Sequence, residues 1–176
     1  MKNSKLKIYN IKISKRGFTL IETLVAISIL LLSVSAPLTI ASKGLASSFY
    51  AREQITAFYL AQDAVEYIRN TRDNNFLSGA NWLKGFPDTK GALFTVDTTN
   101  GKMALCPVSG CDALDYNSST GFYRYNDSNA KVSSFIRSIS INTINANEVS
   151  VSVKISWSAG KFNRKFSVRE NILNWQ

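Results

Sequence analysis

The chain has 176 residues, with 21 lysines and arginines against 12 aspartates and glutamates, and no histidine. Its length suits one long helix with one modest domain better than two independent globular domains. The lack of histidine excludes catalytic triads built on histidine, histidine metal ligands and the usual pH switch near neutrality.

The positive charge is concentrated at the N-terminus. Six cations and no anion precede residue 18, namely Lys2, Lys5, Lys7, Lys12, Lys15 and Arg16. Residues 18–176 therefore carry 15 cations against 12 anions, a net charge of only +3. Because positively charged flanks of a membrane helix stay on the cytoplasmic side, the basic segment predicts membrane orientation rather than nucleic-acid binding. Residues 1–17 are interpreted as a basic leader.

An apolar stretch follows the basic segment. Between Phe18 and Ser42 the single charged residue is Glu22. About 20 apolar residues suffice for a helix to cross a membrane, so residues 18–44 are predicted to do so. A carboxylate in such a segment is costly and is a candidate functional group. Pro37 either kinks or loosens this helix or is a proline tolerated within a membrane helix, and both interpretations stay open.

The junction of leader and apolar stretch carries a specific motif. Residues 15–22 read K-R-G-F-T-L-I-E, a string that closely resembles the leader and first residues of type IV prepilins and pseudopilins. An ordinary secretory signal differs, because its cleavage site follows the apolar region. The resemblance implies that a prepilin peptidase cuts between Gly17 and Phe18 and methylates the new Phe18 amine. It also implies that Glu22 attracts the Phe18 amine of a neighbouring subunit during assembly.

The next segment changes from uniformly apolar to amphipathic. Apolar residues recur at three- and four-residue steps, as expected for one buried stripe on a helix, at Ile55, Phe58, Ala61, Val65 and Ile68. We predict a helix over residues 45–75, continuous with the apolar part. From Phe18 it would contain roughly 58 residues and measure about 87 Å.

Residues 76–131 form a variable region with few periodic signals. Ala92–Val96 and Lys102–Cys106 are predicted as short strands, with Asn100-Gly101 as the turn between them. Acidic residues occur at Asp112, Asp115 and Asp127, but no loop has the EF-hand spacing, so they are interpreted as solvated turn residues.

The two cysteines, Cys106 and Cys111, flank a short Pro-Val-Ser-Gly segment. Zinc sites need about four ligands, and a redox-active motif needs two intervening residues instead of four. Pro107 and Gly110 favour a turn, and an extracytoplasmic compartment permits oxidation. We predict a disulfide, with two unpaired thiols as the alternative.

The C-terminal part, residues 132–176, has the alternation typical of half-buried strands. Apolar side chains alternate with polar ones in Val149–Trp157 and in Phe162–Val168, and Phe135–Ile144 precedes them as a third strand. Short links between three strands predict an antiparallel β-meander, whose apolar face would be covered by the stripe of residues 55–68. Ile172, Leu173 and Trp175 are expected to join that core. The predicted fold class is α+β and type IV pilin-like.

The favoured function is a structural minor subunit of a type IV pilus-like filament, of the kind that takes part in pilus assembly or initiation. A pseudopilin of a type II secretion system is the close alternative. A competence pilin contacting DNA through Lys161, Lys165 and Arg169 is a further one, although such cations also serve as a solvated face or edge guard. An uncut membrane-anchored domain would leave Gly17 and Glu22 unexplained. No catalytic residues, metal site or cofactor are predicted.

The expected partners follow from the resemblance. They are the prepilin peptidase, other pilins or pseudopilins bound through the N-terminal helix, and the inner-membrane assembly platform, with nucleic acid not expected. The chain should cross the cytoplasmic membrane once, with its N-terminus inside and its C-terminal domain outside, and then enter the pilus or pseudopilus.

Overall fold

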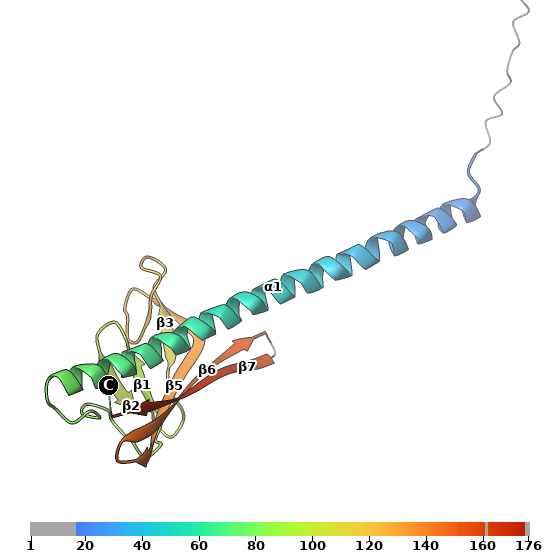
Figure 1. Cartoon of the computed structure of the whole chain (residues 1–176). Helices are drawn as coiled ribbons and strands as arrows, with labels where there is room; N and C mark the ends of the chain where they lie inside the picture. The colour runs from blue at the N-terminus through green and yellow to red at the C-terminus, as the bar shows by residue number, and fades with distance from the viewer. Residues whose placement is uncertain (1–16, 161, 175–176) are drawn as a thin grey trace, which may run out of the picture. The chain divides into compact units, whose positions relative to one another are not determined.

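The computed structural model describes residues 17–160 and 162–174 (Figure 1). The leader before Gly17, together with Lys161 and Trp175, lies outside the described residues. One helix, α1, runs from Leu20 to Leu77, and the chain forms two compact units that meet within it, at Ser47 and Ser48.

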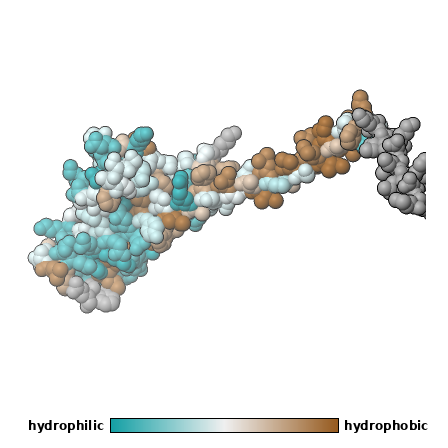
Figure 2. All heavy atoms as spheres, turned by 90° about the horizontal axis from the view of Figure 1, so that it is seen from above, coloured by the Kyte–Doolittle hydropathy of each residue, from teal (hydrophilic) through white to brown (hydrophobic). Residues whose placement is uncertain are grey.

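The first unit consists of the N-terminal part of α1. Every residue from 17 to 47 is exposed, and Figure 2 shows hydrophobic side chains gathered along this part of the helix. Pro37 lies inside α1, and the residues around it remain helical. Proline removes the hydrogen bond that its nitrogen would donate to the carbonyl four residues earlier, yet the helix continues. The structure therefore agrees with a tolerated proline.

The second unit combines the C-terminal part of α1 with a seven-stranded sheet (Figure 1). The strands are β1 (Phe94–Asp97), β2 (Lys102–Leu105), β3 (Ala113–Tyr116), β4 (Tyr123–Arg124), β5 (Lys131–Asn145), β6 (Glu148–Ala159) and β7 (Phe162–Leu173).

The last three strands form the antiparallel meander that the alternation predicts. Ile139 of β5 pairs with Val153 of β6, which pairs with Val168 of β7. On its other side β5 pairs with both β1 and β3, and these continue to β2 and β4. All of these pairings are antiparallel, so the predicted α+β fold with a long N-terminal helix is confirmed.

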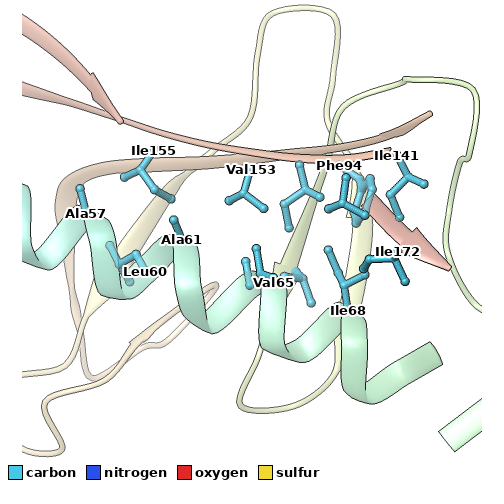
Figure 3. Close-up of a cluster of buried hydrophobic side chains, with 14 of the residues drawn as sticks. Ala57, Leu60, Ala61, Val65, Ile68, Phe94, Ile141, Val153, Ile155 and Ile172 are labelled. Carbon is cyan, nitrogen blue, oxygen red and sulfur yellow. The ribbon is translucent and has the colours of Figure 1, made fainter. Parts of the chain in front are cut away.

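The core lies between one face of the sheet and a stripe on α1. Figure 3 shows helix side chains facing Val153, Ile155 and Ile141 of the meander. The buried helix residues are Ala57, Leu60, Ala61, Ala64, Val65 and Ile68. Three of the six are alanines, and small side chains let a helix approach a sheet closely. Burial of these apolar side chains supplies the main driving force for packing the two layers together.

Two residues of the predicted stripe do not belong to the core. Ile55 and Phe58 are 56% and 47% exposed. The helix contacts the sheet along the line of its alanines, so these larger side chains flank the interface instead of filling it. Phe58 instead meets Phe166 of β7 edge to face, with ring centroids 5.9 Å apart.

The remaining differences concern strand extents and ends. The two short strands predicted in the variable region correspond to β1 and β2, but β3 and β4 also arise there, at positions where no strand was predicted. β5 begins at Lys131 instead of Phe135. Phe162, expected on the apolar face of the last strand, is 66% exposed at the hairpin end. Ile172 does join the core, as expected.

Candidate functional site

The bond between Gly17 and Phe18 lies in an exposed segment just before α1. Residues 17–19 have no regular secondary structure, and Phe18 is 81% exposed. A peptidase could therefore reach this bond without unwinding a helix. Phe18 lies two residues before the first helical residue, so a new N-terminus at this position would sit at the helix start.

The first turn of α1 is capped by a reciprocal pair of hydrogen bonds. The Glu22 amide donates to the Thr19 side-chain oxygen at 3.2 Å, and the Thr19 amide lies 3.5 Å from a Glu22 carboxylate oxygen. This is the capping-box arrangement, in which a threonine and a glutamate three residues later satisfy free amides at a helix start. The second bond is at the outer limit of hydrogen-bonding distance. Glu22 is exposed, and its carboxylate keeps most of its capacity to accept other donors.

The polar side chains of the apolar half are satisfied within the helix. Six hydroxyl groups donate to carbonyl oxygens three or four residues earlier, those of Thr23, Ser28, Ser33, Ser35, Thr39 and Ser42. Internal bonding of this kind removes the cost of placing a hydroxyl in hydrocarbon. By length and composition α1 is able to cross a membrane.

Cys106 and Cys111 form a disulfide in the loop between β2 and β3. The Cys106 amide donates to the Leu93 carbonyl at 2.8 Å, and the Gly110 amide closes the predicted turn on the Pro107 carbonyl at 2.9 Å. The bridge therefore fixes a local turn beside the β1–β2 hairpin. Within residues 17–160 and 162–174, no group of three or more acidic, histidine or cysteine side chains is arranged to hold a metal ion.

The N-terminal segment decides the family resemblance. Residues 12–36 match the family described as the prokaryotic N-terminal methylation motif. This match spans Gly17, Phe18 and Glu22 and continues into the apolar half of α1. The chain is type IV pilin-like. No curated protein and no solved structure matches it.

For a type IV pilin-like protein the motif has defined consequences. It indicates a structural subunit that a prepilin peptidase processes and that assembles with other pilins in a membrane. The exposed apolar half of α1 fits anchoring in the membrane and later packing in a filament. The motif is shared by pili and pseudopili, so it supports both kinds of subunit equally.

The cations proposed for DNA contact are only partly described. Lys165 and Arg169 are exposed on the outer face of β7, and the Arg169 side chain donates to the Ser152 hydroxyl at 3.2 Å. Lys161 lies outside the described residues. The described pair has the arrangement of a solvated edge strand.

The sequence interpretation missed two residues that organise the pilin-like structure. One is Thr19, although the Thr-x-x-Glu spacing is typical of a capping box at a helix start and could have predicted it. The other is Arg137, a fully buried cation in β5. Its guanidinium donates to the carbonyl oxygens of Leu60, at 3.1 Å, and Val96, at 2.6 Å. The available signal was a cation at an inward position of an alternating strand, between Phe135 and Ile139.

Proposed function

We propose that this protein is a minor subunit of a type IV pilus-like filament and takes part in its assembly or initiation. The observation that carries the proposal is a lone carboxylate, Glu22, on the first turn of an exposed apolar helix directly after a prepilin-type cleavage motif. The helix would hold the subunit in the membrane and then pack against neighbouring helices. The same apolar surface would be buried in both environments.

Glu22 would set the axial register between subunits. A charge at the centre of a membrane helix costs about 2.5–3.5 kcal/mol, and less near the interface. Cleavage would free the Phe18 amine of a neighbouring subunit, and that amine would neutralise the carboxylate. Basic residues before Gly17 would keep the N-terminus in the cytoplasm, with the sheet-containing unit outside.

Several features support a minor over a major subunit. By the resemblance, many major pilins carry a cysteine pair that brackets the C-terminal region. Here the disulfide joins Cys106 to Cys111, only five positions apart and ahead of the meander. The acidic and basic helix Ala61–Arg72 and the strand-rich C-terminal part are similar to minor pilins of the pilus modification or assembly kind.

The capping box supplies a sharp test of the role of Glu22. Glutamine at the same position preserves a capping box but carries no charge. We therefore compare wild type, Glu22→Gln, Glu22→Ala and Thr19→Ala at matched expression, measuring cleavage, membrane insertion and presence in sheared filaments. If the charge sets the axial register, both Glu22 variants are cleaved and inserted into the membrane but are absent from the sheared filaments. Thr19→Ala, which keeps the charge, is incorporated into the filaments.

Two outcomes would contradict this role. Normal incorporation of Glu22→Gln together with loss of Glu22→Ala and Thr19→Ala would make Glu22 a capping residue. Equal incorporation of all four proteins would show that neither cap nor charge matters for assembly. Normal pili but impaired protein secretion on deletion of the gene would favour the pseudopilin alternative.

A further inference from the structure

A hollow of about 460 Å³ opens in the second unit, between α1 and the turns that precede β2 and β4. This volume lies in the range of small-molecule sites, about 300–1,000 Å³. Three aromatic rings line the hollow, those of Tyr59, Phe122 and Tyr123, together with the carboxylate of Asp63. Of the described residues that line it, Asp63 is the one charged side chain. The hollow therefore combines aromatic faces with a single negative group.

The Asp63 carboxylate is held in place and keeps one oxygen free. Its Oδ2 accepts hydrogen bonds from the Arg137 guanidinium, at 2.9 Å, and from the Thr98 hydroxyl, at 2.7 Å. No hydrogen bond among the described residues uses Oδ1, and the side chain is 47% exposed. Asp63 thus offers the hollow a carboxylate oxygen whose position is fixed before any ligand binds, which lowers the entropic cost of binding.

Arg137 offsets only part of the negative charge beside the hollow. It is fully buried, so a ligand in the hollow does not touch it. Arg137 also binds the Val96 carbonyl, directly before Asp97. Burial raises the pKa of Asp97, but its hydrogen bonds outweigh burial and lower the pKa below its usual value, so Asp97 is ionised at neutral pH. Two carboxylates and one guanidinium leave a net charge of −1.

The threonines of the hollow offer hydrogen-bond acceptors. The hydroxyls of Thr56, Thr98 and Thr99 donate their protons to a backbone carbonyl and to two carboxylates of the protein itself. A hydroxyl has one proton, so each of them can only accept from a ligand. These oxygens and the free carboxylate oxygen match a ligand that donates hydrogen bonds, and the faces of aromatic rings attract cations.

The ring of Phe122 is positioned by the turn in which it lies. The Asn117 side chain accepts hydrogen bonds from the amides of Ser119 and Thr120, at 3.0 and 3.2 Å. The Asn117 amide donates to the Phe122 carbonyl at 3.0 Å. Asn117 is itself buried. The aromatic wall opposite α1 is therefore already formed in the free protein.

A neighbouring hollow limits the charge that a ligand can carry. It shares Thr56 and Tyr123 with the first hollow, but it is lined by Arg52 and Lys131 against the single acid Glu53. A ligand that extended past Tyr123 with a second cationic group would meet like charges there. The first hollow is thus suited to a ligand with one cationic group.

We propose that this hollow binds one organic cation that carries N–H groups, an ammonium or a guanidinium on an apolar stem. The cationic group donates to Oδ1 of Asp63 and lies against the rings of Tyr59 and Phe122, while the stem packs along Leu60. A lysine or arginine side chain of a partner protein and a free monoamine share this chemistry. The site lies outside the N-terminal half of α1 on which the proposed function rests, so either proposal can fail without the other.

The test uses the full mature chain in micelles of an uncharged polyoxyethylene detergent, with carbon-13 in the threonine methyl groups. Thr56, Thr98 and Thr99 report the hollow. Thr89 and Thr143, which hydrogen-bond to each other and do not line the hollow, are internal controls. The ligands are butylammonium, a capped arginine amide, tetramethylammonium, which is a cation without N–H groups, spermidine, which has several cationic groups, and the neutral polyol methyl glucoside.

Two variants and a matched control locate the site. Asp63→Asn keeps the shape of the side chain and removes its charge. Phe122→Ala removes a ring that is 55% exposed at the hollow. Phe162→Ala is the control, because it removes a ring that is 66% exposed but does not line the hollow. Should Asp63→Asn fail to fold, the comparison of the two phenylalanine variants decides.

We expect butylammonium and the capped arginine to shift the three reporter threonines saturably and to leave Thr89 and Thr143 in place. Both should bind several-fold more tightly than tetramethylammonium and methyl glucoside, and spermidine should bind no better than butylammonium. Asp63→Asn and Phe122→Ala should weaken binding several-fold, and Phe162→Ala should not. Tighter binding of the capped arginine would assign the cation to a protein partner, and tighter binding of butylammonium would assign it to a free amine.

Four results would overturn the inference. They are no saturable shift with any ligand in folded wild type, equal binding of methyl glucoside or tetramethylammonium, tighter binding of spermidine, and unchanged binding in Phe122→Ala.

Discussion

The buried guanidinium of Arg137 donates to the carboxylate of Asp63 at 2.9 Å, across the interface between β5 and α1. Arg137 is fully buried, whereas the Asp63 side chain is 47% exposed. The same guanidinium also binds the carbonyl oxygens of Leu60 and Val96. One side chain thus connects the helix, the central strand and β1, while the ion pair gives its charge a partner.

Removing the acidic partner should destabilise the protein moderately. We expect Asp63→Asn to lower the free energy of unfolding by about 1–2 kcal/mol. A hydrogen bond to a charged group contributes more to stability than one between neutral groups, but solvent screening of the half-exposed carboxylate reduces that contribution. Urea unfolding of the full chain in detergent, followed by tryptophan fluorescence, measures the change. Glu66→Gln is the control, because its pair with Arg69 is more exposed and should cost less than about 1 kcal/mol. Equal losses in the two variants would contradict the importance of the buried pair.

Asp97 should make stability depend on acidic pH. Burial alone raises the pKa of this carboxyl, but hydrogen bonds from the Thr99 hydroxyl, from its amide and from the Tyr125 amide prevail and lower the pKa below its usual value. A lowered folded-state pKa contributes stability above the unfolded pKa of about 3.9, and that stability is lost as the pH falls through the folded value. In wild type we expect the urea concentration at the midpoint of unfolding to fall once the pH drops below about 4.

In Asp97→Asn the midpoint should already be lower at pH 7 and should change less between pH 7 and pH 3. The amide oxygen accepts fewer hydrogen bonds than a carboxylate and carries no charge to be titrated. A variant with the same pH profile as wild type would show that another carboxyl controls acid unfolding.

Cleavage should occur between Gly17 and Phe18. The small residue and the cationic flank stand before the apolar helix, and the bond lies in an exposed, non-helical segment. N-terminal analysis of protein from membranes should read Phe-Thr-Leu-Ile-Glu with a methylated amine. A chain that still begins at Met1 in cells with active peptidase would contradict the pilin interpretation.

The Cys106–Cys111 bridge should be present in the exported protein and contribute little to stability. Its loop is much shorter than the 15-residue loop for which cross-linking gives about 3 kcal/mol, so the loss in a double serine variant should be smaller. Mass spectrometry without reduction should find the native protein two hydrogen masses lighter than the reduced form. Thiols that react readily with a labelling reagent in the native protein would exclude the bridge.

The abundance of the chain in filaments tests the minor-subunit proposal. Deleting the gene should change filament number or secretion, although the protein itself should be a trace component of sheared filaments. Quantitative mass spectrometry of those filaments gives its ratio to the main subunit. Finding this chain as the dominant band would make it a major pilin.

The sequence by itself determined a helix able to cross a membrane and the meander. The apolar run after Phe18, with Glu22 as its single charged residue, is recognisable from the sequence because lipid accepts few polar side chains, whatever the rest of the chain does. The strands β5 to β7 could be predicted because their side chains alternate between core and solvent with a period of two. Glu22 and the Gly17–Phe18 bond belong to the same short stretch, so no long-range contact was needed to propose roles for them.

The tertiary structure decided which face of α1 is buried and which polar groups join the layers. The periodicity predicted Ile55 and Phe58 as core residues together with Ala61, Val65 and Ile68. In the structure the helix approaches the sheet closely, and Ala57 and Ala64 are buried in place of Ile55 and Phe58. Hydropathy alone ranks alanine below isoleucine and phenylalanine. Arg137 and Asp63 are 74 positions apart. Their pairing depends on where β5 lies beneath the helix, which neither segment encodes alone, because a buried charge is tolerated only where distant partners converge on it.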